Sequence, residues 1–229
     1  MNPTRNKLNA PDDPHAGQPI RAVGPAPEDA KATLLLIHGR GAYADSILSL
    51  HESLGLAEVA FLAPQAYGNT WYPQSFLAPL DANQPYLDSA LAKIDAVVTN
   101  LLSRGVPSER IAILGFSQGA CLTTEYVARR PRRYGAVMGL TGALIGPPGT
   151  TRSYPGSLAG TPVFLGTSDP DSHVPFERVR ETEKVLAAMG AKVEFRRYAG
   201  MSHMINEDEL VVCRRLLRAV VASPVEGKP

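Results

Sequence analysis

Residues 110–125 constrain the fold of this chain more than any other segment. Residues 111–114 (Ile-Ala-Ile-Leu) form a short apolar run of the kind that a buried parallel strand shows. The pentapeptide Gly-Phe-Ser-Gln-Gly follows at 115–119, and from Gln118 the pattern turns helical. A strand, a sharp turn and a helix in this order lift one serine, here Ser117, above the edge of a sheet. The two glycines suit such a turn, because it leaves no room for a Cβ atom at their positions.

Apolar runs alternate with helical stretches along the chain. The runs are short, rich in Val, Ile and Leu, and bounded by Gly or Pro, as strands covered on both faces should be. Helical spacing of apolar residues lies between them and predicts helices around 87–101, 176–189 and 210–220, besides the helix that starts at Gln118. This alternation predicts an α/β fold with a mostly parallel sheet and helices on both faces. The predicted strands are 33–37, 59–63, 111–114, 136–140, 162–165 and 193–198.

A length of 229 residues suits a single domain, which we predict over residues 17–221. We expect residues 1–16 and 222–229 to be loose tails. Two irregular stretches, 64–85 and 142–160, are dense in Gly and Pro and follow the carboxyl ends of predicted strands. Ligands bind at those ends in open α/β sheets, and long loops in compact domains are usually functional. The sequence leaves open whether these two loops close over a site.

Composition narrows the function classes. A formal net charge of +1 gives no electrostatic reason to expect a nucleic acid or an anionic membrane as partner. No run of 18 apolar residues occurs, and the first thirty residues lack the apolar core of a signal peptide, so we expect a cytoplasmic protein. Two cysteines are too few for a disulfide framework, and the five histidines are scattered, so no metal site or cofactor is implied. Whether the chain forms a homodimer stays open.

Ser117 needs partners, because a serine hydroxyl is a poor nucleophile at neutral pH without an adjacent base held by a third group. On sheets of this kind the three groups follow in the order Ser, acid, His. Of the two histidines after Ser117, His203 comes just after the last predicted strand and before a helix, which makes it the candidate base. The acid should follow strand 162–165, where Asp169 and Asp171 stand two residues apart. Spacing alone does not choose between them.

A serine nucleophile also needs two main-chain N–H donors for the oxyanion of its tetrahedral intermediate. One comes from the residue after the nucleophile, here Gln118, and the other from a loop after an early strand. The loop His-Gly-Arg-Gly at 38–41 fits the second role, since Gly39 lets the backbone approach a substrate. We therefore predict the N–H groups of Gln118 and Arg40 as the oxyanion hole, with His38 supporting the loop by hydrogen bonding.

Four motifs together resemble the phospholipase/carboxylesterase family of α/β-hydrolases, which includes acyl-protein thioesterases and small bacterial carboxylesterases. They are His-Gly-Arg-Gly at 38–41, Gly-Phe-Ser-Gln-Gly at 115–119, Asp-x-x-Val-Pro at 171–175 and Gly-x-x-His at 200–203, and the likeness runs from about Thr33 to Leu217. The resemblance implies an α/β-hydrolase fold and a serine carboxylesterase that works through an acyl-enzyme. The family's spacing to Val-Pro points to Asp171 as the acid, whereas its spacing from the end of the strand points to Asp169. We favour Asp171 and keep Asp169 as the alternative.

Family members place an aromatic pair near the substrate pocket, and Trp71 and Tyr72 fall in the matching region, so the resemblance implies that they and Gly39 bind substrate. A core tryptophan is an equally weighted alternative for Trp71. The loop reads Thr-Trp-Tyr-Pro-Gln-Ser-Phe rather than the Trp-Phe-Asp pattern of the thioesterases, so thioesterase activity is not carried over. His173 also departs from the thioesterase pattern, and we favour packing at a helix N-terminus over a place at the rim of the site.

The expected function is hydrolysis of small-molecule carboxylic esters, of small or medium chain length, without a cofactor. A thioesterase, a lysophospholipase or a lactone hydrolase could use the same three residues. A carbon–carbon bond hydrolase is a further alternative, and so is a binding protein that has kept the fold without catalysis. The fold by itself does not separate these activities.

Overall fold

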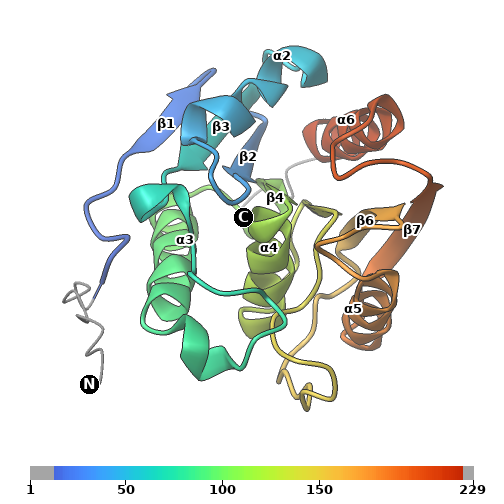
Figure 1. The fold of residues 1–229 in the computed structure, drawn as a ribbon. Coiled ribbons are helices and arrows are strands. Elements are labelled where there is room, and N and C mark those ends of the chain that lie inside the picture. The colour runs from blue at the N-terminus through green and yellow to red at the C-terminus, as the bar shows by residue number, and fades with distance from the viewer. Residues whose placement is uncertain (1–12, 224–229) are drawn as a thin grey trace, which may run out of the picture.

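The computed structural model describes residues 13–223 and contains a seven-stranded sheet with helices on both faces (Figure 1). The strand order is β1-β3-β2-β4-β5-β6-β7, in which β1 pairs antiparallel with β3 and the other six strands run parallel. The strands are β1 (Ile20–Val23), β2 (Ala32–Ile37), β3 (Val59–Pro64), β4 (Ile111–Phe116), β5 (Ala136–Leu140), β6 (Pro162–Asp169) and β7 (Lys192–Ala199).

All six predicted strands are confirmed, and one strand was missed. The missed strand, β1, lies at an edge of the sheet with all four residues exposed, so it lacks the apolar run by which the others were found. Strand β6 is longer than predicted and continues to Asp169, since its pairing with β7 runs on through Thr167 and Ser168, which are buried although they are polar. Burial in the middle of a parallel sheet thus extends past the apolar residues that mark it in the sequence.

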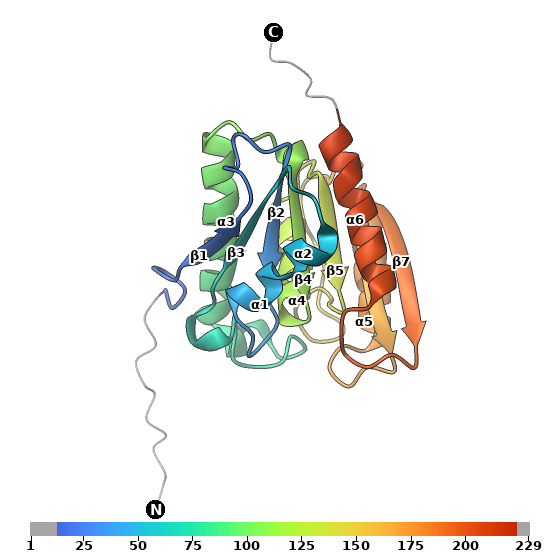
Figure 2. The same ribbon diagram turned by 90° about the horizontal axis from the view of Figure 1, so that it is seen from above.

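The helices form two layers (Figures 1 and 2). One face of the sheet packs against α3 (Tyr86–Ser103), α4 (Gln118–Arg129) and α5 (Phe176–Ala188), and the other against α1 (Ala44–Leu48), α2 (Leu50–Leu54) and α6 (Glu207–Ala222). The four predicted helices are confirmed, whereas the five-residue helices α1 and α2 were not predicted. Three short 3₁₀ helices complete the secondary structure of residues 13–223: η1 (Tyr67–Asn69), η2 (Leu80–Asn83) and η3 (Ser108–Arg110).

Alternation along the strands divides the core in two. On β2, Leu35 and Ile37 contribute to the cluster under α3, α4 and α5, while Leu34 and Leu36 contribute to the cluster under α1, α2 and α6. This period of two follows from the pleat, which points successive side chains to opposite faces. Since β2 to β7 are parallel, the loops after them gather at one edge of the sheet, and that edge carries all the predicted site residues.

The packed part of the chain begins earlier than predicted. His15 falls in the expected tail of residues 1–16 but is fully buried, and its ring accepts a hydrogen bond from Tyr67 N at 3.0 Å and donates one to Trp71 O at 2.9 Å. The loose-tail prediction is therefore wrong for this residue, while residues 1–12 and 224–229 lie outside the described part. No helix within residues 13–223 is long and apolar enough to cross a membrane.

Candidate active site

Ser117 stands in a strained turn between β4 and α4. Its backbone angles, φ 55° and ψ −118°, lie where side chains with a Cβ are rarely found. A Cβ on Gly115 would come 2.2 Å from Gly119 O, and a Cβ on Gly119 would come 2.1 Å from Ile37 O. Both positions therefore require glycine, as the sequence predicted. Ser117 N donates to Leu140 O at 3.0 Å, which fixes the turn against the end of β5.

Three predicted side chains from distant parts of the sequence form one hydrogen-bonded chain. Ser117 Oγ lies 2.8 Å from His203 Nε2, and His203 Nδ1 lies 2.7 Å from Asp171 Oδ2. His203 belongs to the loop between β7 and α6, and Asp171 to the loop after β6. An imidazole held in this way by a carboxylate can accept the proton of the serine hydroxyl at Nε2.

The carboxylate of Asp171 is held by several donors. Its Oδ1 accepts hydrogen bonds from the N–H groups of His173 and Val174, both at 2.8 Å, and its Oδ2 accepts one from the Ser168 hydroxyl. Burial alone would raise the pKa of Asp171, but the hydrogen bonds from Ser168, His203, Val174 and His173 outweigh it and lower the pKa to about 2. The group is thus held as an anion beside His203.

Asp169, the alternative acid, lies elsewhere. It is the last residue of β6, and its carboxylate pairs with the guanidinium of Arg197 on the neighbouring strand β7. Within residues 13–223 it forms no ion pair or hydrogen bond with His203. The single residue between the aspartates, Pro170, lies in a bend after the strand. Asp169 therefore stays at the sheet edge, whereas Asp171 contacts the histidine.

The loop after β2 packs directly against the strained turn at residues 115–119 that carries Ser117, called the elbow below. A Cβ on Gly39 would lie 3.4 Å from Ser117 Cβ. His38 supports the loop as expected, because its Nδ1 donates to Gly39 O at 2.8 Å while its Nε2 accepts from Ala66 N at 3.1 Å. Burial lowers the pKa of His38, which suits a neutral ring in this role. The N–H groups of Arg40 and Gln118 have no hydrogen-bond acceptor within residues 13–223.

The predicted aromatic pair divides between core and cavity. Trp71 is fully buried, its Nε1 donates to His38 O at 2.9 Å, and its ring lies 4.9 Å from that of His38 and 5.3 Å from that of His15. It does not line the cavity beside Ser117, so the prediction that Trp71 binds substrate is wrong. Gly39 is also absent from the cavity wall. Tyr72 lines the cavity, and burial raises its pKa.

The side chain of Gln118 has a role that sequence reasoning missed. Its Oε1 accepts a hydrogen bond from Trp71 N at 2.9 Å, and its Nε2 donates one to Tyr72 O at 2.8 Å. The first residue of α4 thus fixes the 64–85 loop to the elbow. The one signal in the sequence is a long amide at the start of an otherwise small and apolar helical turn.

A cavity of about 440 Å³ opens beside Ser117 and His203. His173 lies in its wall with its ring 4.9 Å from that of His203, so the favoured placement of His173 away from the site rim is wrong. Burial raises the pKa of Cys121, also in the wall, to about 11, which keeps this thiol neutral. The cavity is lined by Arg40, Tyr72, Pro73, Gln74, Ser75, Phe76, Ser117, Gln118, Cys121, His173, Val174 and His203.

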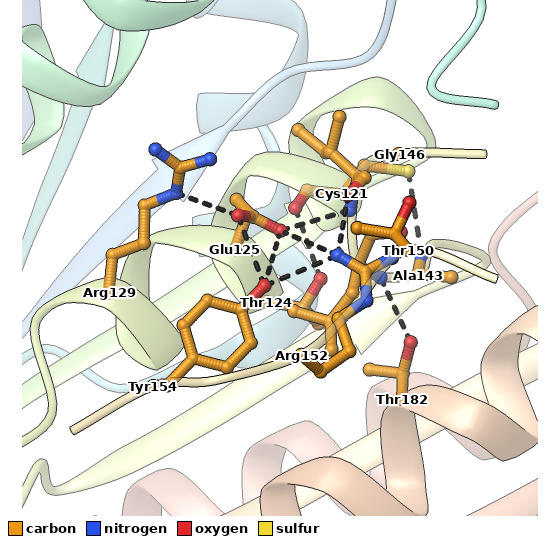
Figure 3. Close-up of polar contacts among 12 residues, drawn as sticks. Cys121, Thr124, Glu125, Arg129, Ala143, Gly146, Thr150, Arg152, Tyr154 and Thr182 are labelled. Atoms are coloured by element: carbon orange, nitrogen blue, oxygen red, sulfur yellow. Dashed lines mark hydrogen bonds and ion pairs between the residues drawn. The ribbon is translucent and has the colours of Figure 1, made fainter. Parts of the chain in front are cut away.

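The other long loop, 142–160, contributes no residue to this cavity wall. Figure 3 shows that Glu125 of α4, one side chain with many partners, holds this loop in place. The loop is nevertheless connected to the cavity wall, because Gly146 N donates a hydrogen bond to the main-chain oxygen of Phe76, a lining residue, at 2.7 Å.

Comparisons with known proteins agree with this geometry. Residues 19–221 match the Phospholipase/Carboxylesterase family. The chain is 27% identical over 199 residues to a probable carboxylesterase SOBER1-like of Arabidopsis thaliana, covering 79% of this chain and 76% of the relative. It is 25% identical over 205 residues to acyl-protein thioesterase 1 of Saccharomyces cerevisiae, covering 80% and 90%.

Among solved structures, the crystal structure of a phospholipase/carboxylesterase from Dyadobacter fermentans superposes with a TM-score of 0.84 at 44% identity, covering 88% of this chain and 96% of the other. The likeness therefore extends over almost all of the described sheet and its helices. The chain belongs to the phospholipase/carboxylesterase family of α/β-hydrolases and is a carboxylic ester hydrolase.

Proposed function

We propose that Ser117 is the nucleophile of this esterase, with His203 as general base and acid and Asp171 as the residue that orients His203. The observation that carries the proposal is the continuous hydrogen-bonded chain from Asp171 Oδ2 through His203 to Ser117 Oγ, at 2.7 and 2.8 Å. These distances lie within the range in which a base can take up the hydroxyl proton directly.

The reaction then runs in two halves. Ser117 Oγ bonds to the ester carbonyl carbon while its proton passes to His203 Nε2. The tetrahedral intermediate collapses, the bond to the alcohol oxygen breaks, and His203 returns the proton to that oxygen. In the second half, water attacks the acyl-enzyme, again losing its proton to His203, and the carboxylic acid leaves as Ser117 recovers its proton.

The N–H groups of Arg40 and Gln118 are proposed to stabilise the oxyanion of both intermediates. Support comes from the packing of the 38–41 loop against Ser117 and from the lack of any other acceptor for these two donors within residues 13–223. Donors held in place before the reaction need no rearrangement when the negative charge develops.

The proposed substrate is a small-molecule ester with a short or medium acyl chain. A cavity of about 440 Å³ is at the small end of ligand sites, and its wall combines apolar groups with a few polar ones. Thioester hydrolysis uses the same acyl transfer and is the second candidate, because the relatives of this chain include acyl-protein thioesterase 1 of Saccharomyces cerevisiae. A cytoplasmic location stays a prediction, and so does the possible homodimer.

The first experiment is hydrolysis of 4-nitrophenyl esters from acetate to laurate by the wild type and by Ser117→Ala. The variant should lose about 10⁴-fold or more in kcat, because the three residues act as a unit. Ser103→Ala, at the exposed end of α3, is the matched control and should retain activity. A Ser117→Ala enzyme that keeps a tenth of the activity would exclude Ser117 as nucleophile.

A second pair of variants tests the acid. Asp171→Asn should lower kcat by about 10⁴-fold, since an amide disfavours the tautomer of His203 that accepts a proton at Nε2. Asp169→Asn removes the same charge two residues earlier and should retain most of the activity, because its partner is Arg197. The reverse ranking would reassign the acid to Asp169.

A further inference from the structure

The cavity beside Ser117 holds a positive charge that no carboxylate neutralises. Arg40 is exposed and lines the cavity, and no Asp or Glu oxygen of residues 13–223 lies within 4.0 Å of its guanidinium. None of the residues that line the cavity is acidic. The carboxylate of Asp171, which belongs to the hydrogen-bonded chain with Ser117 and His203, already accepts hydrogen bonds from His203, Ser168 and two main-chain N–H groups.

The Arg40 guanidinium is also held in a fixed place. Its Nη1 donates to Pro73 O at 2.8 Å and its Nη2 donates to Gln74 O at 2.6 Å, and Pro73 and Gln74 both line the cavity. These bonds use two of about five N–H donors, so the others remain for a ligand. A guanidinium that is already immobilised loses little further conformational entropy on binding, and it stays charged at any physiological pH.

From this arrangement, and building on the ester hydrolysis proposed above, we propose that the enzyme prefers esters that carry an anionic group, a carboxylate or phosphate, and that the Arg40 side chain binds it. Arg40 then has two separate functions, since its main-chain N–H faces the oxyanion and its side chain faces the anion of the substrate. His173 also lies in the cavity wall, with its ring 4.9 Å from that of His203.

The anion could belong to the acyl group or to the alcohol, and two substrate pairs separate these cases. For the acyl side, 4-nitrophenyl hydrogen adipate is compared with 4-nitrophenyl methyl adipate. For the alcohol side, 4-acetoxybenzoate is compared with its methyl ester. Each pair differs by one negative charge. Intrinsic reactivity cancels when the ratio of kcat/KM within a pair is compared between enzymes.

The ratio is measured for the wild type, Arg40→Gln, Arg40→Lys and Arg218→Gln. We expect Arg40→Gln to lower the anionic-to-neutral ratio about fivefold for one of the pairs, the size of an interaction with an exposed charge. Arg40→Lys should keep part of the preference, because it keeps the charge. Arg218→Gln removes an exposed charge from α6 and should leave both ratios unchanged.

Ionic strength gives a readout that a purely structural role would not move. Raising NaCl from about 0.05 to about 0.5 M should lower the wild-type preference for the anionic ester and leave the Arg40→Gln ratio unchanged, since salt screens exposed charges. An Arg40→Gln enzyme that loses anionic and neutral activity equally would show that Arg40 only braces the 72–76 segment, and would overturn the inference. Wild-type enzyme that hydrolyses the neutral esters with no preference in either pair would overturn it while leaving the proposed esterase function intact. Failure to hydrolyse any of the four esters would overturn both.

Discussion

Glu125 in α4 and Glu209 in α6 are both buried, with 1% and 0% of their surface exposed, and each fixes a loop at the edge of the sheet that carries the site. Glu125 accepts hydrogen bonds from Ile145 N at 3.0 Å and from the Tyr154 hydroxyl at 3.2 Å, which hold the 142–160 loop (Figure 3). Two arginines face the same carboxylate, Arg129 at 2.7 Å and Arg152 at 3.7 Å.

Glu209 holds the loop that carries His203 with far fewer partners. Its Oε2 accepts from Asn206 N at 3.0 Å, while Oε1 has no partner within residues 13–223 and faces Gly166 of β6. No Lys, Arg or His nitrogen of the described part lies within 4.0 Å of it. Burial, and secondly the charge of the neighbouring Asp208, raise the pKa of Glu209 to about 7, although the Asn206 bond lowers it.

The difference shows two ways in which a fold accommodates a buried carboxyl group. The negative charge of Glu125 is compensated by guanidinium groups and hydrogen-bond donors, so the charged form is stable in the interior. A negative charge on Glu209 would have no such compensation, so burial favours the protonated form of its carboxyl group. The first arrangement ties the stability of the fold to the presence of each partner, and the second ties it to pH.

The largest expected effect follows from breaking the charged arrangement. Glu125→Ala should lower the free energy of unfolding by about 3–5 kcal/mol, because the buried Arg152 would keep only Glu181 of its two carboxylate partners. The Ile145 N–H and the Tyr154 hydroxyl would lose their acceptor as well. Chemical denaturation at neutral pH measures this. Glu183→Ala removes the partner of Arg180, a pair that is partly exposed to solvent, and should change stability by about 0–1 kcal/mol. Equal effects of the two variants would contradict the importance of burial.

The second effect is a pH dependence specific to Glu209. Because its pKa is raised on folding, the folded state holds a proton that the unfolded state has lost between about pH 4.5 and 7, so stability should decrease as pH rises through this window. The contribution is about 2–3 kcal/mol. Glu209→Gln cannot ionise, so the difference in unfolding free energy between variant and wild type should grow from pH 4.5 to 7.5. Glu207→Gln, which removes an exposed carboxylate from the same helix, is the control and should show a constant difference. A constant difference for Glu209→Gln would contradict the prediction.

Asp171 is intermediate between the two glutamates, since it is rich in hydrogen-bond donors but has no arginine partner. Its pKa is depressed to about 2, so its contribution to stability is present above about pH 4 and is lost as pH falls through about 2. We expect the stability advantage of wild type over Asp171→Asn to shrink by about 1–2 kcal/mol between pH 5 and pH 2. Thermal unfolding at a series of pH values measures this, and an advantage that persists unchanged at pH 2 would contradict it.

The parallel strands and the strand–turn–helix at Ser117 could be predicted from the sequence because these features depend on local patterns. Short apolar runs mark buried strands, and the glycines of the elbow report a turn without room for Cβ. The chain order of serine, acid and histidine then narrowed the partners to a few residues. Strand β1 and the two aspartates could not be resolved in this way, because an exposed edge strand has no apolar run and a spacing of two residues does not say how a loop turns.

The long-range contacts were not predictable. Nothing local indicates that Gln118 binds the main chain at Trp71 and Tyr72, or that Trp71 packs between His15 and His38. Loops 64–85 and 142–160 looked alike in composition, yet only the first supplies cavity walls. Their difference arises from partners far away in sequence, which a periodic pattern does not encode.

The smallest expected effect concerns activity and separates the two loops. Glu125→Gln keeps the shape of the side chain, and should change kcat/KM for a short 4-nitrophenyl ester by less than about threefold, since the 142–160 loop does not line the cavity. Gln118→Ala loses both bonds to the 64–85 loop and leaves a buried N–H and C=O at Trp71 and Tyr72 without partners, so we expect about a tenfold loss in kcat/KM. Steady-state kinetics on folded samples of both variants, checked by circular dichroism, makes the comparison. If Glu125→Gln lost as much activity as Gln118→Ala, the 142–160 loop would also be needed to position the cavity wall. The hydrogen bond from Gly146 N to Phe76 O would then be the contact that transmits the effect to the 64–85 loop.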